Sequence, residues 1–204
     1  MPASATPRPA PGRPRDPLVD DRILTATEEL LVTEGYQATT IAAVARRAGI
    51  VATSIYRRWP GKRELVEDTV FGLDTGAHPV PTGDLHADLR AWTELFLATA
   101  AHPAARAAIP GLLADYHGDQ ALYHRLLDRG ERPTIDALRE LLAAAAARGT
   151  AAPDCDVEAI FEILRGATLL RALTHGLEHH AEFCERITRA LVTVARASTA
   201  ANDG

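Results

Sequence analysis

The sequence has 204 residues, of which 47% are hydrophobic and 24% charged, with a net charge of −5 and a pI near 5.9. This apolar content is enough for a sizeable core, and the acidic total excludes a protein that coats nucleic acid with its whole surface. No apolar run reaches the ~18 residues of a membrane-spanning helix, and the proline-rich N-terminus lacks the apolar segment of a secretory signal. We therefore expect a cytoplasmic protein without membrane contacts.

The charge is distributed unevenly along the chain. Residues 1–63 hold ten basic and six acidic side chains, a net of +4, which leaves −9 for the remainder. Between Gly35 and Arg63 there is no acid, whereas five arginines and Lys62, the only lysine, contribute +6. A basic block in an acidic protein predicts a local site for a polyanion.

The first predicted elements are an N-terminal arm and a helix. Residues 1–17 contain six prolines, which cannot sustain a helix, so we expect a disordered basic arm there. A helix follows, because Ile23, Ala26 and Leu30 recur at steps of three and four. Gly35 is its natural end.

The rest of the chain also has helical periodicity, and no strand pattern of useful length occurs. Thr40 is a suitable N-cap for a short second helix that reaches Gly49, and Pro60 ends a third helix. The third and later helices are placed at about 52–59, 62–73, 84–101, 104–116, 119–148, 157–175 and 181–197. The 119–148 helix is expected to kink at Gly130 and Pro133. The sequence thus predicts an all-α protein.

The second and third helices, with the turn between them, form a helix-turn-helix candidate. Such a motif places its second helix in the major groove of DNA, so that helix must be short and carry small or polar residues at its leading end. Ala52, Thr53 and Ser54 meet this requirement, and Gly49 permits the tight turn before them. Ile55 would pack back on the preceding helix.

The stretch from Arg22 to Val66 resembles the DNA-binding domain of the TetR family of regulators. The matching segments, in the family's order and spacing, are Glu34-Gly35-Tyr36, Thr39-Thr40-Ile41, Ala48-Gly49-Ile50, Ser54-Ile55-Tyr56 and Trp59-Pro60-Gly61-Lys62-Arg63-Glu64-Leu65. Two positions depart from the pattern, since Val51 and Gly61 stand where capping residues are common. The resemblance implies a three-helix head, joined by a linking helix to a helical body for ligand binding and dimerisation.

The resemblance also divides the chain into parts. Residues 18–66 would form the DNA-binding domain and residues 67–198 the ligand-binding and dimerisation domain. Residues 199–204 would be a disordered tail, as the arm at 1–17 would be at the other end.

The resemblance implies a set of DNA contacts in the head. The positions that match the family's DNA-contacting residues are Thr40, Ala52, Thr53, Ser54, Tyr56, Arg57 and Lys62. The three residues at the start of the third helix would face base edges or the backbone; the others would bind phosphates, and Arg57 could reach a base. Arg47 is a further candidate, although Arg46 and Arg47 could instead pair with acids of the first helix such as Glu28 or Glu34.

The arm adds a second candidate contact. Gly12-Arg13-Pro14-Arg15 resembles a hook that carries Arg13 and Arg15 into a narrow minor groove, with a solvated basic tail as the alternative. The expected partner is double-stranded DNA with a near-palindromic operator. Two recognition helices of a dimer would reach successive major grooves, ~34–36 Å apart.

The body offers candidates for dimerisation and ligand binding. The last two helices carry more apolar residues than two outer helices need, which favours a four-helix dimer bundle over a purely intrachain core. The resemblance implies a homodimer and a cavity for an unknown small molecule that would release the operator. Residues that would line this cavity, or else belong to the ordinary core, are Trp92, Phe96, Tyr116, Tyr123 and Thr168.

Other chemistry finds little support in the sequence. His175, His179 and His180 include a helical pair spaced for zinc, but no motif adds a third ligand, which favours a solvated or interface cluster. Cys155 and Cys184 lack metal-ligand spacing and predict two free thiols. No phosphate-binding loop and no nucleophilic serine motif occurs. We therefore expect no cofactor, no metal and no enzymatic activity.

The leading hypothesis is a dimeric repressor that responds to a small molecule. The alternative is a helical ligand-binding or partner-binding protein that does not bind an operator, and a small helical enzyme is the third hypothesis. The basic block at residues 35–63 favours the regulator, because neither alternative requires it.

Overall fold

The computed structural model describes residues 17–72 and 78–198. Within these ranges all regular structure is helical and no strand occurs, which confirms the predicted fold class. Residues 1–16 of the predicted arm, with Arg13 and Arg15, and the predicted tail lie outside the described residues, whereas Pro17, the last residue of that arm, begins α1.

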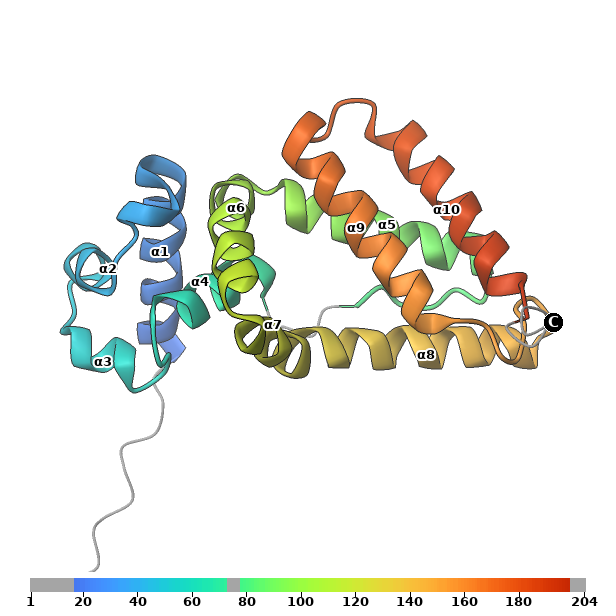
Figure 1. The fold of residues 1–204 in the computed structure, drawn as a ribbon, viewed down its shortest axis with the longest axis horizontal. Coiled ribbons are helices and arrows are strands. Elements are labelled where there is room, and N and C mark those ends of the chain that lie inside the picture. Colours follow the sequence, from blue (N-terminus) through green and yellow to red (C-terminus); the bar gives the residue numbers. More distant parts are fainter. Residues whose placement is uncertain (1–16, 73–77, 199–204) are drawn as a thin grey trace, which may run out of the picture.

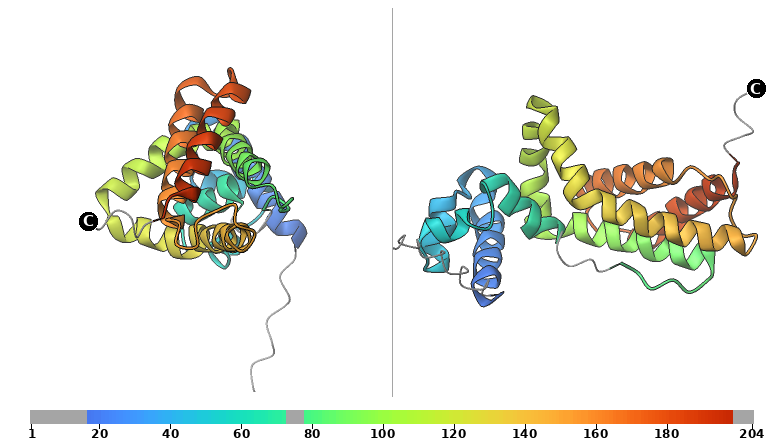
Figure 2. Two further views of the ribbon diagram at one scale, coloured as in Figure 1. Left: turned by 90° about the vertical axis from the view of Figure 1, so that its right-hand side faces the viewer. Right: turned by 90° about the horizontal axis from the view of Figure 1, so that it is seen from below.

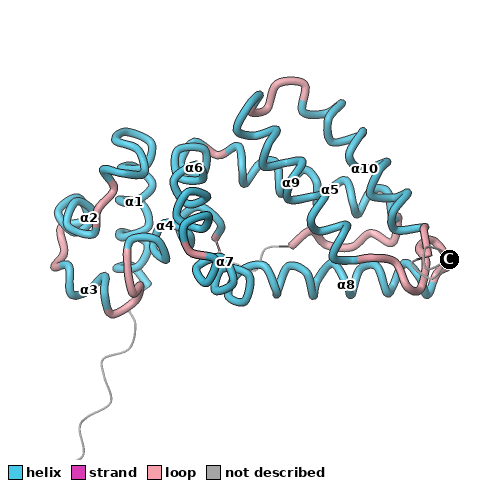
Figure 3. The backbone as a smooth tube through the Cα atoms, in the orientation of Figure 1, coloured by secondary structure: helices cyan, strands magenta, loops and turns pink. Residues whose placement is uncertain are grey.

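Ten α-helices and one π-helical segment make up the described chain (Figure 1). Figure 3 shows how short the loops between most of them are. In chain order the elements are α1 (Pro17–Ala38), α2 (Ile41–Ala48), α3 (Ala52–Tyr56), α4 (Lys62–Phe71), α5 (Leu85–Ala101), α6 (Pro103–Gly118), α7 (Gln120–Leu126), η1 (Leu127–Glu131), α8 (Arg132–Ala147), α9 (Val157–His175) and α10 (His180–Arg196).

Two boundaries in the head differ from the sequence prediction. Gly35 interrupts the first helix instead of ending it, since its φ of 79° and ψ of 174° are non-helical and helix resumes after it. The third helix stops at Tyr56, before the predicted end at Trp59. The amides of Arg58 and Trp59 both donate to the Ile55 carbonyl, at 2.8 and 2.9 Å, and so close the chain into a turn.

The long helix predicted for residues 119–148 is divided by η1, at the expected position. A π-helical turn contains an extra residue compared with an α-helical turn, and here it separates α7 from α8. Pro133 lies in the first turn of α8, where a missing amide hydrogen costs nothing. The predicted kink near Gly130 and Pro133 is therefore confirmed as a break between two helices.

The molecule consists of a compact head and an elongated body (Figures 1 and 2). Helices α1, α2 and α3 form the head, and α4 leads from it towards the body. Helix α6 stands between the head and the long body helices, and both α1 and α4 pack on it. In the body, α5 packs against α9 and α10, and α8 packs against α9.

The head has a hydrophobic core of its own, and a second core joins it to the body. Ile23, Val44 and Ile55 are among the buried residues of the head core. The second core, here called the head–body seam, combines buried side chains of α1 and α4 with those of α6. Its members include Leu31, Tyr36, Val66, Ala105, Ala108 and Leu112.

A glycine allows the close approach of α1 and α6 in the head–body seam. A Cβ atom placed on Gly111 would lie 2.1 Å from Cδ1 of Tyr36, much closer than any van der Waals contact. The Tyr36 ring therefore packs directly on the backbone of α6. Its hydroxyl also donates to Oδ2 of Asp115 at 2.6 Å, which ties the end of α1 to α6.

Candidate DNA-binding surface and ligand cavity

Helix α2 is fixed by a side-chain cap at its start and by a glycine in the turn that leads to α3. The Thr40 hydroxyl accepts a hydrogen bond from the Ala43 amide at 3.1 Å and caps α2, while the residue stays exposed. Gly49 adopts the left-handed conformation, with φ 64° and ψ 41°, and the next amide, of Ile50, returns to the Ala45 carbonyl at 3.0 Å. The Gly49 conformation and the Ile50 bond set the angle at which α3 leaves α2, while the Thr40 cap fixes the start of α2.

Helix α3 is anchored by one side chain and presents the others. Ile55 is fully buried in the head core, which orients the five-residue helix. Thr53 and Tyr56 are exposed, and Ser54 and Ala52 are half-buried. The predicted reading end of α3 therefore lies at the surface, with small side chains that let a DNA groove approach closely.

The N-termini of α3 and α4 lack side-chain caps, as the departures from the family pattern predicted. Val51 precedes α3 without a cap hydrogen bond, and its apolar side chain is 66% exposed. Gly61 precedes α4, also without one. The first-turn amides of α4 thus have no side-chain acceptor at the cap position, and a helix N-terminus with open amides attracts an anion such as phosphate.

Half of the six basic side chains between residues 35 and 63 are paired with acids from outside that block. Arg47 pairs with Glu29 and Glu34 of α1, at 3.1 and 3.5 Å. Arg58 is paired with Asp20 of α1. The +6 block counted in the sequence is therefore partly neutralised in the fold, and Arg47 would have to leave its partners in order to bind DNA.

Arg63 is the third paired cation. Its guanidinium lies 2.6 Å from Glu64 and 3.7 Å from Glu67, both in α4. Arg46 and Arg57, by contrast, are exposed, and no acid pairs with them among the described residues. Arg57 donates only a long bond of 3.4 Å to Ser54 Oγ, next to the predicted reading end.

Lys62 lies on the face of an aromatic ring at the edge of the head. Its Nζ is 3.9 Å from the centroid of the Tyr36 ring and donates to the Gln37 carbonyl at 3.4 Å. Partial burial lowers the pKa of Lys62. The ammonium is thus held beside the N-terminus of α4, where the resemblance implied a phosphate contact.

The body encloses a cavity of about 670 Å³, within the size range of small-molecule sites. All five residues that the sequence analysis assigned to a ligand cavity line it: Trp92, Phe96, Tyr116, Tyr123 and Thr168. Apolar side chains from α4, α5, α6 and α9 complete most of the wall, among them Phe71, Leu95, Ile109, Leu112, Phe161 and Leu169.

The sequence analysis missed several polar residues of the cavity, and the two that carry charge are Arg165 and Glu131. Arg165 of α9 donates through Nη1 to both carboxylate oxygens of Glu131, at 2.8 and 2.7 Å, and also to the Tyr123 hydroxyl. Burial raises the pKa of Glu131, and the Arg165 guanidinium offsets part of that rise. Arg165 follows Phe161 by four residues and precedes Thr168 by three, so its place on the apolar stripe of α9 was a signal for a lining residue.

Tyr116 connects the cavity with the head. Its ring lines the cavity, and its hydroxyl donates to Oε1 of Glu67 in α4 at 2.9 Å. Glu67 is itself buried and lies 3.7 Å from Arg63. Thr168, in contrast, donates its hydroxyl to the Leu164 carbonyl at 2.7 Å, so its donor is already used within α9.

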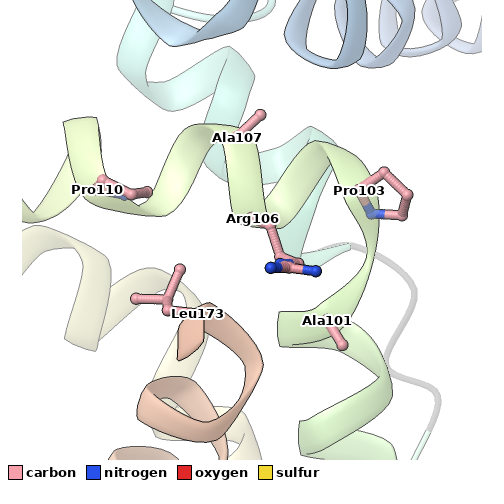
Figure 4. A pocket seen from close by; sticks show the side chains of 6 residues that line it. All are labelled: Ala101, Pro103, Arg106, Ala107, Pro110 and Leu173. Carbon is pink, nitrogen blue, oxygen red and sulfur yellow. The ribbon is translucent and has the colours of Figure 1, made fainter. Parts of the chain in front are cut away.

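A second hollow lies at the junction of α5, α6 and α9 (Figure 4). It is lined by Ala101, Pro103, Arg106, Ala107, Pro110 and Leu173. Arg106 of α6 and Leu173 of α9 project towards the same space from opposite sides. Arg106 is the one charged group in this wall, and the small apolar residues around it provide no further hydrogen-bonding side chain.

The remaining candidates from the sequence have ordinary surroundings. The described residues contain no group of three or more His, Cys, Asp or Glu side chains arranged for a metal. His180 Nδ1 lies 3.2 Å from the Leu177 carbonyl, and His175 Nδ1 lies 2.7 Å from Thr174 Oγ1. Both cysteines are free thiols. None of the described helices has the length and hydropathy that crossing a membrane requires.

Two family models match the chain, one on each part. The model described as "Bacterial regulatory proteins, tetR family" matches residues 23–69. The model described as "Tetracyclin repressor-like, C-terminal domain" matches residues 79–191, which is more than half of the chain.

The chain is also similar to individual regulators over most of its length. It is 27% identical over 168 residues to the HTH-type transcriptional regulator YdeS of Bacillus subtilis, covering 82% of this chain and 84% of YdeS. It is 28% identical over 156 residues to the DNA-binding transcriptional repressor TetR of Mycobacteroides abscessus, covering 76% and 81% of the two chains. The crystal structure of the TetR family transcription regulator SCO0332 superposes with a TM-score of 0.67 at 28% identity, covering 86% and 97%. All of these relatives are transcriptional regulators and none is an enzyme.

Proposed function

The chain belongs to the TetR family of bacterial regulatory proteins and is a DNA-binding transcriptional regulator, and from that premise we propose that it is a homodimeric repressor released from its operator by a small molecule. One observation carries the ligand response: Tyr116 lines the body cavity and donates a hydrogen bond to Glu67 of α4. A single side chain thus contacts both the ligand space and the helix that leads to the head.

In the proposed complex, α3 lies in the major groove of a near-palindromic operator. Ala52, Thr53 and Ser54 approach base edges, while the first-turn amides of α4 and nearby side chains hold phosphates. The side chains proposed for the phosphates are Thr40, Tyr56, Arg57 and Lys62. The Mycobacteroides abscessus relative is named a transcriptional repressor, which supports repression over activation. A repressor must meet the cell's DNA, so the proposal places the protein in the bacterial cytoplasm.

An exposed apolar stripe supports the homodimer. Ile163, Leu170 and Leu177 follow one another at seven-residue intervals on and just beyond α9, and they are 36%, 65% and 53% exposed. Ile163 and Leu170 share one face of α9, whereas Leu177 lies beyond the C-cap Gly176, whose φ of 59° ends the helix, and is a third exposed apolar side chain near that end. Large apolar groups on one face favour burial against a second copy, which would place two heads on one operator.

The head–body seam supports transmission from the cavity to the head. Helix α6 carries Tyr116 on the cavity side and packs through Gly111 on Tyr36 of α1. A ligand that displaces the Tyr116 ring would disturb its bond to Glu67 and the position of α6 together. Because the seam is close-packed, α6 cannot shift without moving the head.

Operator binding is tested by selecting DNA from a random-sequence library with the purified protein. A near-palindromic consensus is expected, with an affinity that falls steeply as salt concentration rises, because phosphate contacts release counterions. A selection that yields no preferred sequence contradicts the proposal. It favours the alternative of a helical protein that binds a ligand or partner without an operator.

The Tyr116→Phe variant tests the ligand response. The substitution keeps the ring in the cavity wall and removes the bond to Glu67. Any compound that releases the wild-type protein from the selected operator lowers operator affinity by some factor. In the variant this factor should be about two to ten times smaller, which corresponds to the loss of one hydrogen bond. By linkage, the effect of operator DNA on affinity for that compound must shrink by the same factor.

Tyr123→Phe is the matched control for this experiment. Tyr123 also lines the cavity, but its hydroxyl contacts Arg165 and not α4. This variant is expected to change affinity for the compound while the coupling to DNA persists. Full coupling in Tyr116→Phe, or equal loss in both variants, contradicts the proposed route.

A further inference from the structure

The wall of the cavity contains a series of neighbouring aromatic rings. The ring centroids of Trp92 and Phe96 are 6.1 Å apart, and those of Phe96 and Phe161 are 5.9 Å apart in an edge-to-face pair. The guanidinium carbon of Arg165 follows, 5.4 Å from the Phe161 centroid. The Trp92 indole, which also packs on the His78 ring with centroids 5.0 Å apart, and the Arg165 cation are thus separated by apolar surface that suits the body of a hydrophobic molecule.

The guanidinium at the end of this series has an unused edge. Arg165 makes its three hydrogen bonds, to Tyr123 and to the two oxygens of Glu131, through Nη1 alone. Among the described residues, its Nη2 and Nε make none. A guanidinium binds a carboxylate most strongly through two parallel N–H bonds, and Arg165 still has two donor nitrogens for that purpose.

The indole at the other end has an unpaired donor. Trp92 is 99% buried, and its Nε1 has no hydrogen-bond partner among the described residues, although the side chain lines the cavity. Buried donors are almost always paired in proteins, so an orphan beside a cavity indicates a missing acceptor. A ligand oxygen would supply it.

The charges around the cavity favour an anionic ligand. Glu131 is the only acid among its described lining residues, and both of its oxygens are already held by Arg165. Donors are more numerous, since His117 and Gln120 also line the wall. A cationic ligand would have to compete with Arg165 for one carboxylate, whereas an anion meets donors that are available.

We propose that the cavity binds an amphipathic carboxylate. Its carboxylate binds the free edge of Arg165, its apolar body lies along Phe161 and Phe96, and a hydrogen-bond acceptor at its far end meets the Trp92 indole N–H. This inference rests on the proposed function only in treating the cavity as a ligand site. It adds the chemical class of the ligand and the residues that select it.

Calorimetric titration of the DNA-free protein tests the carboxylate. Two carboxylates, dodecanoate and 1-naphthylacetate, are compared with their methyl esters and with dodecylamine. Both carboxylates are expected to bind at least about tenfold more tightly than their esters, because the ester cannot form a charged bidentate pair. Binding of neither carboxylate, equal affinity for acid and ester, or tighter binding of the amine overturns the proposal.

Two variants assign the carboxylate to Arg165. Arg165→Met should lower the affinity for dodecanoate to that of its methyl ester and leave the ester unchanged, which also shows that the cavity is intact. The matched control is Arg139→Met, which removes a surface arginine that likewise pairs with acids, Asp136 and Glu158, outside the cavity. Unchanged affinity in Arg165→Met, or equal losses in both variants, overturns the assignment.

Glu131→Gln keeps the test decisive if Arg165→Met does not fold. The amide keeps the size of Glu131 and removes its negative charge, so Arg165 loses its competing carboxylate. Affinity for dodecanoate should therefore rise severalfold, with affinity for the ester unchanged. Unchanged or weaker binding of dodecanoate overturns the proposal.

The far end of the ligand is tested with 12-hydroxydodecanoate. Wild-type protein should prefer it to dodecanoate, and Trp92→Phe, which keeps a ring but lacks the N–H, should lose that preference. No preference in the wild type, or a preference that survives in Trp92→Phe, overturns the role of the indole.

The two proposals fail in different ways. A carboxylate that binds through Arg165 but leaves operator affinity unchanged contradicts ligand-responsive repression and keeps the ligand class. An operator released by compounds without a carboxylate contradicts the ligand class and keeps the proposed function.

Discussion

The DNA-binding head and the body cavity use polar side chains in opposite ways. In the head, Arg47 and Arg58 are paired with acids of α1, so much of the positive charge holds the head together. In the cavity, the Arg165 edge and the Trp92 N–H have no protein partner among the described residues. The head thus relies on the placement of small exposed groups, whereas the cavity relies on hydrogen-bond donors that have no protein partner, one buried in Trp92 and one half-buried in Arg165. Substitutions at the seam between them should therefore have larger effects than substitutions on the head surface.

Gly111→Ala should give the largest effect, because it breaks the contact that joins the two regions. The added Cβ would meet three atoms of the Tyr36 ring at 2.1 to 2.7 Å, and the helical propensity of alanine offsets only part of that clash. We expect a loss of about 2–3 kcal/mol in the free energy of unfolding, measured by urea denaturation.

Gly118→Ala is the control for the seam, since it lies in the same helix with nothing within 4 Å of the added atom. It should be neutral or slightly stabilising. Equal stability of the two alanine variants would show that the seam adjusts freely, and transmission through α6 would then lose its physical basis.

Leu170→Glu tests the dimer that brings two heads together. A carboxylate at this exposed apolar position of α9 should cost about 2 kcal/mol, which raises the dimer dissociation constant by roughly thirtyfold. Sedimentation velocity measures the change, and operator affinity should fall with it. Val80→Glu, at a residue 86% exposed and outside α9, should leave the dimer intact. Wild-type protein that sediments as a monomer at micromolar concentration would exclude this interface.

Tyr56→Phe sharpens the distinction between affinity and sequence preference in the head. Loss of one proposed phosphate contact should weaken operator binding by about 1 kcal/mol, or roughly fivefold, to a similar extent for every sequence. Thr53→Val should instead change which bases are preferred, because Thr53 lies at the reading end. Fluorescence anisotropy with operator variants measures both. A changed base preference in Tyr56→Phe would reverse the proposed roles.

Val51→Ser should give the smallest effect, and a favourable one. A serine hydroxyl at the N-cap can accept a hydrogen bond from a first-turn amide of α3, and it replaces an exposed apolar side chain. The gain in the free energy of unfolding should be about 0.5–1 kcal/mol. Val51→Ala, which cannot accept a hydrogen bond, separates the cap from the loss of apolar surface, and an equal gain in both would refute the cap.

Features decided by neighbouring residues could be predicted from the sequence. Thr40 caps α2, Gly49 turns left-handed, and Gly130 and Pro133 mark the break between α7 and α8 as expected. Trp92, Phe96, Tyr116 and Tyr123 were also proposed for the cavity wall and line it, because the family resemblance indicated which body helices enclose a cavity, whereas Phe71 and Phe161 were not proposed. That Thr40 and the exposed residues of α3 contact DNA stays a prediction.

Features decided by distant residues could not be predicted in the same way. The charge count treated residues 35–63 as an isolated block, whereas α1 supplies Asp20, Glu29 and Glu34 to its arginines. The pairing of Arg165 with Glu131 joins residues 34 positions apart across a π-helical turn. Hydrophobic periodicity indicates which residues share a face, but it does not say which charged groups meet when two helices pack.

The two tryptophans occupy the two regions compared above. Trp59 is buried in the head core and donates its indole N–H to Asp68 at 2.6 Å, whereas Trp92 lies in the cavity wall with an unpaired indole. Because indole emission shifts with the polarity and hydrogen bonding of its surroundings, each tryptophan would report on one region. The protein therefore contains an intrinsic optical sensor at each end of its proposed signalling route, without any attached dye.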